Sequence, residues 1–516
     1  TAGGNTGSTV TQDLSRAQAI NNGSITINNA DDAMGIFIED GTAINNGRNG
    51  QGIFITNTSR VPTTASYGIK AEKGTVENNG VIDMNVLVSA DGSSIVDSYG
   101  IFSDSANINN NVNGSIVFRK RGTGIATTSG RVINMGSISL EQGGTGISSS
   151  NGDVYNVENA TITINDNNTA ASTGIVAQAG KITNDGTITI TNGNGATGIK
   201  AGLLVDNNNL IEMTGRNVTG IELTGQDATA NNNADINITS NGNSENNYGI
   251  KAGASAVNAT IINNDDIILT GDNNYLSSQQ RGYGISIADG TADNKGKITF
   301  NDMYGWGMYT TAGTITNSTG TITLNDGGTG MYGSGSTAQI INRNDITINV
   351  PNNNNQALSY GLYADGGASA NNTAGAEIRI NSSSSISQML SDAFGIYVNQ
   401  GNGSNLGSII INGSNSTGMA YAGTGTSDST NDQIINMEGG RIDLTGSYNF
   451  GMTAAGGTAI NAGIINVGVR DEDGTLTQST NSIGMQTTGG TVSNQEIINV
   501  NSADSVGLQS DAENGT

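Results

Sequence analysis

The sequence predicts an all-β fold, a parallel β-helix of about 18 rungs with three short strands in each rung. Three observations support this prediction. A Gly step, usually Gly-Ile or Gly-Met, recurs along the whole chain. β-Branched residues alternate with polar residues between Gly- and Asn-rich turns, and an Asn recurs at a fixed distance before an Ile.

The Gly step sets the period of the repeat. Neighbouring steps are about 22 to 24 residues apart when the interval is short and about 28 to 35 apart when it is long. A fixed minimal period with variable additions is typical of a solenoid whose repeats stack on one another. We therefore expect residues 1–516 to be one continuous solenoid and a fragment of a longer array. The steps fall at Gly35, Gly68, Gly100, Gly124, Gly146, Gly174, Gly198, Gly220, Gly249, Gly284, Gly307, Gly330, Gly361, Gly395, Gly418, Gly451, Gly484 and Gly507.

Residues 173–199 show one repeat clearly. Their period-two alternation between turns indicates short strands with one buried face. Ile182, Ile188 and Ile190 are expected to point inward, and a charge at Ile188 should disrupt the surrounding core. We expect right-handed winding, because parallel crossovers usually take that hand. The three strands are expected near 173–177, 181–183 and 187–190.

An Asn stands four residues before the first core Ile of the third strand in many repeats. Asn tolerates a left-handed backbone, and its amide can pair with the same residue of the next rung. We therefore predict a stacked Asn ladder at one corner, with a structural role. The predicted members are Asn21, Asn78, Asn134, Asn184, Asn294, Asn342, Asn461 and Asn494.

The long intervals contain insertions, most of them between the third strand and the next Gly step. We expect them to protrude as loops from one corner of the β-helix, except for one insertion that follows the first strand. Loops on one face of a rigid solenoid are a common place for a binding site. The insertions lie near 57–66, 89–98, 271–282, 351–359, 381–393, 424–432 and 468–482.

Aromatic residues gather around several Gly steps. They occur directly before the Gly after many long connections, and further tyrosines follow the Gly. One interpretation is that each aromatic ring packs beneath the preceding loop. The functional alternative is a line of rings that stacks on sugars, which Tyr421 would extend. The candidate ligand contacts are Tyr283, Trp306, Tyr309, Tyr332, Tyr360, Tyr363, Phe394 and Tyr397.

Composition excludes several classes of function. The formal charge is -24, which opposes binding to nucleic-acid backbones or anionic membranes. The chain has no cysteine and no histidine, so it can form neither disulfides nor thiolate zinc sites. No apolar run is long enough to span a bilayer as a helix. We expect no cofactor and no metal site.

An enzyme is the alternative from a different class, because some β-helices cleave polysaccharides. Glycoside hydrolysis needs two carboxylates that face each other at a defined distance. The acidic residues are scattered through strands and turns and form no such pair in the sequence pattern. We therefore expect no enzymatic activity and no catalytic residue. The acidic candidates are Asp265, Asp266, Asp302, Asp326, Asp345 and the run Asp471 to Asp473.

The units GTITNSTGTITLNDGGTGMYG (313–333) and IINVNSADSVGLQS (497–510) resemble repeats of the large type V autotransporter adhesins of fusobacteria. That family includes the arginine-inhibitable radial adhesin. The resemblance implies a secreted passenger, a β-helix displayed outside the outer membrane and anchored by a C-terminal barrel. It covers nearly the whole chain, but no family binding residue can be matched.

The sequence and this resemblance together favour a noncatalytic cell-surface adhesin. Its expected partners are receptors or glycans of host or bacterial cells, and the segment itself is expected to be a monomeric rod that does not enter the membrane. A structural alternative is a stalk that projects a binding tip located elsewhere. A second alternative is a polysaccharide-degrading β-helix enzyme.

Overall fold

A computed structural model of the chain contains β-strands and their connections in every part that it describes. The described residues are 17–30, 32–47, 50–59, 64–87, 98–166, 171–241, 246–271, 281–350, 358–382, 393–423, 432–469 and 480–511. None of them belongs to a helix that could cross a membrane. The chain divides into two compact units: unit 1 is Thr1–Asn165 with Gly174–Lys181, and unit 2 is Asp166–Thr173 with Ile182–Thr516.

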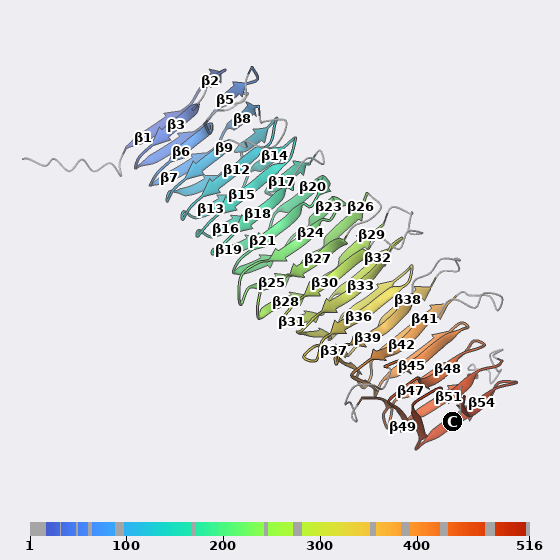
Figure 1. Cartoon of the computed structure of the whole chain (residues 1–516). Helices are drawn as coiled ribbons and strands as arrows, with labels where there is room; N and C mark the ends of the chain where they lie inside the picture. Colours follow the sequence, from blue (N-terminus) through green and yellow to red (C-terminus); the bar gives the residue numbers. More distant parts are fainter. Residues whose placement is uncertain are drawn as a thin grey trace, which may run out of the picture. The chain divides into compact units, whose positions relative to one another are not determined.

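Successive strands enter three parallel sheets in turn, and the described residues place 18 strands in each sheet (Figure 1). The predicted parallel β-helix is therefore confirmed.

Sheet A holds β1 (Gln18–Asn21), β4 (Thr42–Asn45), β7 (Thr75–Asn78), β10 (Asn107–Asn110), β13 (Val132–Asn134), β16 (Val154–Asn156), β19 (Lys181–Asn184), β22 (Leu204–Asn207), β25 (Thr229–Asn232), β28 (Ala259–Asn263), β31 (Gly290–Asn294), β34 (Thr314–Asn317), β37 (Gln339–Asn342), β40 (Ser369–Asn372), β43 (Asn402–Asn405), β46 (Gln433–Asn436), β49 (Thr458–Asn461) and β52 (Thr491–Asn494).

Sheet B holds β2 (Ile25–Asn28), β5 (Gly52–Asn57), β8 (Val81–Val86), β11 (Ser115–Phe118), β14 (Ser137–Leu140), β17 (Thr161–Asn165), β20 (Thr187–Asn194), β23 (Ile211–Arg216), β26 (Ile236–Ser240), β29 (Ile267–Thr270), β32 (Lys297–Asn301), β35 (Thr321–Leu324), β38 (Ile346–Val350), β41 (Glu377–Ser382), β44 (Ser408–Asn412), β47 (Arg441–Leu444), β50 (Ile464–Val467) and β53 (Ile497–Val500).

Sheet C holds β3 (Met34–Ile38), β6 (Tyr67–Ala71), β9 (Tyr99–Ser103), β12 (Gly122–Thr127), β15 (Gly144–Ser149), β18 (Thr173–Ala177), β21 (Thr197–Ala201), β24 (Thr219–Leu223), β27 (Asn246–Ala252), β30 (Arg281–Ile287), β33 (Tyr304–Thr310), β36 (Gly328–Ser334), β39 (Ser359–Asp365), β42 (Ala393–Asn399), β45 (Ser416–Tyr421), β48 (Phe450–Ala454), β51 (Ile483–Thr487) and β54 (Val506–Ser510).

The core of each unit consists of inward-facing apolar side chains, with many Ile and Ala, from all three sheets. Alternate residues of a strand point to opposite faces, so the alternation seen in the sequence becomes a buried row and an outer row. Ile182, Ile188 and Ile190 have no exposed surface, as predicted. Burial of one such side chain contributes roughly 1.5 to 3 kcal/mol, and a stacked solenoid adds this contribution with every rung.

The Gly steps lie on sheet C, where the backbone passes close to the core side chains of sheet B. A Cβ atom placed on Gly220 would lie 2.6 Å from the carbonyl oxygen of Gly249 and 2.6 Å from Cγ2 of Ile236. Real Cβ atoms do not approach backbone oxygens so closely. The step therefore needs glycine because no space exists for a side chain.

The Asn ladder is confirmed in both units. Within each unit, the side-chain amide nitrogen of every ladder Asn except the last donates to the Oδ1 atom of the Asn on the next strand of sheet A, over 2.7 to 3.0 Å. In unit 1 the bonded residues are Asn21, Asn45, Asn78, Asn110, Asn134 and Asn156. In unit 2 they are Asn184, Asn207, Asn232, Asn263, Asn294, Asn317, Asn342, Asn372, Asn405, Asn436, Asn461 and Asn494.

The central parts of all seven predicted insertions lie outside the described residues. In the chain, six of them stand between a sheet B strand and the following sheet C strand. The seventh, near 424–432, stands between β45 of sheet C and β46 of sheet A. The protrusion of these insertions as loops from one corner stays a prediction.

Candidate functional site: an aromatic surface on sheet C

All eight predicted ligand-contact residues lie on sheet C of unit 2, and together we call them the aromatic surface. They occupy the five consecutive sheet C strands from β30 to β42. Their strands are β30 (Tyr283), β33 (Trp306 and Tyr309), β36 (Tyr332), β39 (Tyr360 and Tyr363) and β42 (Phe394 and Tyr397).

The strand register arranges the rings in two columns. One column stands before the Gly step, where Tyr283 pairs with Trp306 and Tyr360 pairs with Phe394. The other stands two residues after the step. It is continuous over four strands and consists of Tyr309, Tyr332, Tyr363 and Tyr397. Parallel in-register pairing thus turns a repeated sequence position into a row of rings.

The rings contact one another within and between the two columns. Tyr309 and Tyr332 are stacked, with ring centroids 5.1 Å apart. Tyr363 is nearly perpendicular to both column neighbours, at 5.0 Å from Tyr332 and 5.0 Å from Tyr397. Tyr360 joins the columns at 4.7 Å from Tyr363. Such pairs each contribute about 0.5 to 1.5 kcal/mol beyond area burial, so the surface is already ordered before any ligand binds.

Most of these rings are half-buried, which leaves part of each ring open to solvent. Tyr360 is the buried exception, with 8% of its surface exposed. Burial is the main cause that raises the pKa values of Tyr309, Tyr332, Tyr363 and Tyr397. The pKa of Tyr332 rises to about 12. The hydroxyl groups are therefore neutral hydrogen-bond donors and acceptors at neutral pH.

A carboxylate borders the aromatic surface at the end of β39. Asp365 accepts a hydrogen bond from the Tyr332 hydroxyl at 3.3 Å through Oδ2. Its Oδ1 accepts another from Nδ2 of Asn399 at 3.1 Å. After burial, the charge of Asp365 is the next cause of the raised pKa of Tyr332, Tyr363 and Tyr397.

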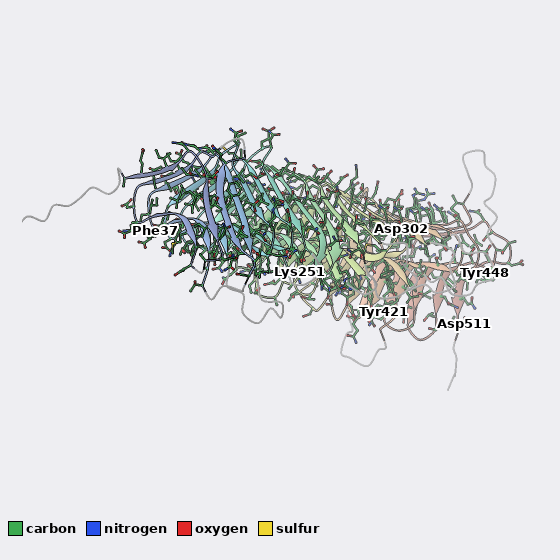
Figure 2. The ribbon with its side chains drawn as sticks, turned by 90° about the horizontal axis from the view of Figure 1, so that it is seen from above. Phe37, Lys251, Asp302, Tyr421, Tyr448 and Asp511 are labelled. Atoms are coloured by element: carbon green, nitrogen blue, oxygen red, sulfur yellow. The ribbon has the colours of Figure 1, made fainter. Side chains whose placement is uncertain are left out.

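Tyr248 on β27 extends the first column beyond Tyr283. The two rings are stacked at 4.7 Å, and the ammonium group of Lys251 lies 4.6 Å from the centroid of the Tyr248 ring. Lys251 is labelled in Figure 2. Tyr248 was not among the eight predicted ligand contacts. Its position directly before a Gly step is the sequence signal that could have identified it.

Tyr421 was expected to extend the second column, and that prediction is wrong. Its register partner is Val398, whereas the partner of Tyr397 is Ala420. Tyr421 therefore stands three residues after its Gly step, on the inner face, and only 3% of its surface is exposed. Its hydroxyl donates to Oδ2 of Asp432 at 2.9 Å.

Unit 1 has a smaller aromatic cluster on the same sheet. Tyr67 and Tyr99 are stacked at 5.4 Å, and Phe102 packs edge-on against both. The ammonium group of Lys70 lies 5.1 Å from the Tyr67 ring centroid. In both units, an aromatic residue before the Gly step stacks on its copy in the next rung. The other interpretation of these rings was that each one packs beneath the preceding loop. The residues of those loops lie outside the described ranges, so this interpretation stays a prediction.

Two of the acidic residues considered for catalysis contact groups on a neighbouring rung. Asp326 accepts a hydrogen bond from the backbone N–H of Asp302 at 2.6 Å through Oδ2. Burial and the charge of Asp302 raise the pKa of Asp326, while this hydrogen bond lowers it. Asp266 lies 3.6 Å from the ammonium group of Lys297. The run 471–473 lies outside the described residues.

No group of three or more acidic residues in the described ranges is arranged to hold a metal ion. The expected absence of a cofactor, and of catalysis, stays a prediction.

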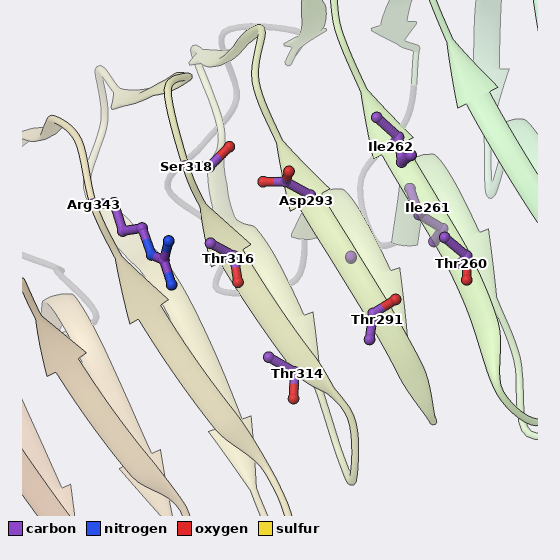
Figure 3. A pocket seen from close by; sticks show the side chains of 10 residues that line it. Thr260, Ile261, Ile262, Thr291, Asp293, Thr314, Thr316, Ser318 and Arg343 are labelled. Carbon is purple, nitrogen blue, oxygen red and sulfur yellow. The ribbon is translucent and has the colours of Figure 1, made fainter.

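Sheet A of unit 2 contains a shallow hollow of about 360 Å³ (Figure 3). Thr291, Thr314 and Thr316 line it from adjacent strands, with Arg343 at one side. Asp293 also lines it and lies 3.7 Å from the ammonium group of Lys295. The hollow carries hydroxyl groups and charges of both signs, whereas the aromatic surface combines a large apolar area with a polar border.

Comparison with known proteins identifies a β-helix domain within the chain. Residues 153–375 match the family described as the BigA third pectate lyase-like domain. This part of the chain is therefore similar to a β-helix domain of the BigA type. This BigA-type match includes the aromatic surface from Tyr283 to Tyr363, while Phe394 and Tyr397 follow it. No curated protein and no solved structure matches the chain.

Proposed function

We propose that this chain is a noncatalytic cell-surface adhesin segment that binds carbohydrates of host or bacterial cells through the aromatic surface. Its site of action is then extracellular, on the surface of the bacterial outer membrane. The observation that carries the proposal is the continuous second column of four tyrosines on neighbouring strands, bordered by Asp365.

The chemistry of this surface suits sugars. Tyrosine and tryptophan present large, rigid and amphipathic contact areas at a low cost in conformational entropy. A sugar ring has an apolar face of C–H groups and a border of hydroxyl groups, so it needs both an aromatic partner and hydrogen-bonding groups. The aromatic surface offers both, because its rings adjoin tyrosine hydroxyls, Asp365 and Asn399.

The fold supports a binding role in a second way. Contiguous exposed apolar areas are uncommon on soluble proteins unless they bind something. Loss of two or three central aromatic anchors usually removes most of the affinity of such a surface. The same rungs contain the Asn ladder on sheet A and the Ile core, and the sheet C strands pair in register, so the surface is rigid in advance of binding.

The test uses the full chain and a variant that carries Tyr309→Ala, Tyr363→Ala and Tyr397→Ala. A matched control removes three aromatic side chains elsewhere, with Phe37→Ala, Tyr155→Ala and Tyr448→Ala. Binding is measured to bacterial cells, to epithelial cells and to a glycan array. We expect saturable binding by the wild type, a loss of at least about tenfold in the aromatic variant, and little change in the control.

Three results would contradict the proposal. Equal binding by the wild type and the aromatic variant would place the site elsewhere on the chain. Absence of binding by a folded wild type would favour the stalk alternative, in which the segment only projects a tip. Shortened or unsaturated products after incubation with the bound polysaccharide would favour an enzyme instead.

A further inference from the structure

We infer that the aromatic surface selects extended, uncharged glycans over acidic ones, and that Asp365 and Asn399 determine this specificity by contacting sugar hydroxyls. This inference rests on the proposed function, because it concerns the ligand of the same surface. The inference gives the row of polar residues beside the rings, here called the polar border, a role separate from that of the rings themselves.

The polar border follows the second aromatic column on three of its four strands. Ser334, Asp365 and Asn399 are register partners on β36, β39 and β42. Each stands two residues after a tyrosine of the second column, so it points to the same outer face. A ligand that lies on Tyr332, Tyr363 and Tyr397 therefore has this polar row along one side.

Asp365 and Asn399 are held in place but keep hydrogen-bonding capacity. The carboxylate of Asp365 accepts one hydrogen bond on each oxygen, from Tyr332 and from Asn399. A carboxylate has about four acceptor positions, so about two remain for ligand hydroxyls. Hydrogen bonds to a charged acceptor are stronger than neutral ones. A fixed carboxylate beside aromatic rings can thus position hydroxyl groups on a ring that rests against them.

The charge of Asp365 opposes acidic ligands. No lysine or arginine forms an ion pair with it in the described part of the chain. Its charge acts on the neighbouring phenols, as their raised pKa values show. The same negative potential acts on any ligand carboxylate at this place, and the net charge of -24 adds to it over a longer range.

The length of the columns indicates an extended ligand. Tyr309 to Tyr397 spans four neighbouring strands, and parallel strands lie about 4.8 Å apart. The second column is therefore about 14 Å long, which exceeds the size of a single sugar ring. A linear oligosaccharide that runs across the strands would contact several rings at once.

The experiment compares neutral linear hexose oligosaccharides with their own C6-oxidised uronate forms, so that each pair differs in charge and not in backbone. Binding to the full chain is measured for the wild type, Asp365→Asn and Asn399→Ala. The control is Asp293→Asn, which removes a carboxylate from the hollow of sheet A. Thermal unfolding confirms that all variants are folded.

We expect the wild type to bind the neutral forms at least about tenfold more tightly than the oxidised forms at low salt. Asp365→Asn should reduce this preference severalfold and weaken neutral binding by up to about tenfold. Asn399→Ala should weaken neutral binding, because it removes a support of Asp365, while Asp293→Asn should change neither quantity.

An equal preference in the wild type and Asp365→Asn would overturn the inference, and so would a wild type that prefers the oxidised forms. Both of those results leave the proposed function intact, because the surface still binds glycans. Failure of the wild type to bind any oligosaccharide would instead remove the proposed function and this inference together.

Discussion

The phenolic oxygen of Tyr332 lies 3.3 Å from Oδ2 of Asp365 on the neighbouring strand, so a neutral tyrosine donates a hydrogen bond to a carboxylate at the border of the aromatic surface. Ionisation of Tyr332 would place two negative charges next to each other on a half-buried surface. Burial and this carboxylate raise the pKa of Tyr332 to about 12. The pairing therefore keeps the hydroxyl protonated at neutral pH.

We predict that Tyr332 ionises only near pH 12, and that stability falls as the pH rises from about 10 to that value. The unfolded chain loses the Tyr332 proton near its ordinary pKa of 10.0, while the folded chain retains it. Stability is thus fully present below pH 10 and decreases above it. Spectrophotometric titration at the tyrosinate band and alkaline unfolding would measure both effects.

The Tyr332→Phe variant should lose the contribution of Tyr332 to the high-pH part of the titration and part of the alkaline decrease in stability, while the other tyrosines with raised pKa values still titrate there. Tyr155→Phe, on sheet A of unit 1, is a suitable control for the change in tyrosine content. If Tyr332→Phe leaves the titration curve unchanged, the assignment of a raised pKa to Tyr332 is incorrect.

The fold could be predicted from the sequence because the same requirements recur in every rung. Glycine is required where a sheet C strand passes close to core side chains, and Ile at alternate positions gives the buried face. The Asn rule was incomplete. Asn207, Asn232, Asn263 and Asn405 have the predicted offset but were missed. Asn110 and Asn156 also belong to the ladder. A longer turn follows each of them, so the next core Ile is more than four residues away.

The candidate site was less predictable than the fold. The Gly steps placed the aromatic residues on one sheet, but sequence spacing does not show how two rings meet. Tyr421 was misplaced because it stands one position further after its Gly step than the tyrosines of the second column, and neighbouring positions of a strand face opposite sides. Asp365 was not predicted, because its proximity to Tyr332 depends on the register of two strands that are far apart in sequence.

We predict that Asn232→Ala costs about 3 kcal/mol of local stability. Asn232 is fully buried, accepts from Asn207 and donates to Asn263, each at 2.8 Å. Its loss leaves a buried donor and a buried acceptor without partners, and each costs about 1 to 3 kcal/mol. Hydrogen exchange of the adjacent strands β22 and β28 would measure the effect, because a repeat protein opens locally.

The neighbouring residue provides a matched control. Asn233 is exposed and belongs to a second row, in which it donates to Asn208 and accepts from Asn264. Water can replace these bonds, so Asn233→Ala should cost less than about 1 kcal/mol. Equal protection changes for the two variants would show that burial does not determine the contribution of the ladder.

We predict that Gly220→Ala destabilises unit 2 by about 3 kcal/mol. The added Cβ would lie 2.6 Å from the carbonyl oxygen of Gly249, and backbone must move to relieve that contact. Gly253→Ala is the control, because no atom lies within 4 Å of a Cβ at that position. Calorimetric unfolding of the two variants should show a large decrease for the first and little change for the second.

The last prediction concerns the carboxyl group of Asp326, whose pKa is raised above its ordinary value of 3.8 chiefly by burial. In the pH range between the ordinary and the raised pKa, the folded chain binds more protons than the unfolded chain. Stability attributable to this group therefore falls as the pH rises through that range. Asp326→Asn removes the titration and keeps an oxygen that can accept the backbone N–H of Asp302.

Asp326→Asn should consequently be slightly more stable than the wild type at pH 7, by less than about 1 kcal/mol because the group is partly exposed to solvent. The difference should disappear below the ordinary carboxyl pKa, where Asp326 is protonated in both states. Thermal unfolding from pH 3 to pH 7 would measure it, with Asp345→Asn as the control. A stability difference that does not change with pH would mean that the substitution acts through packing and not through proton binding.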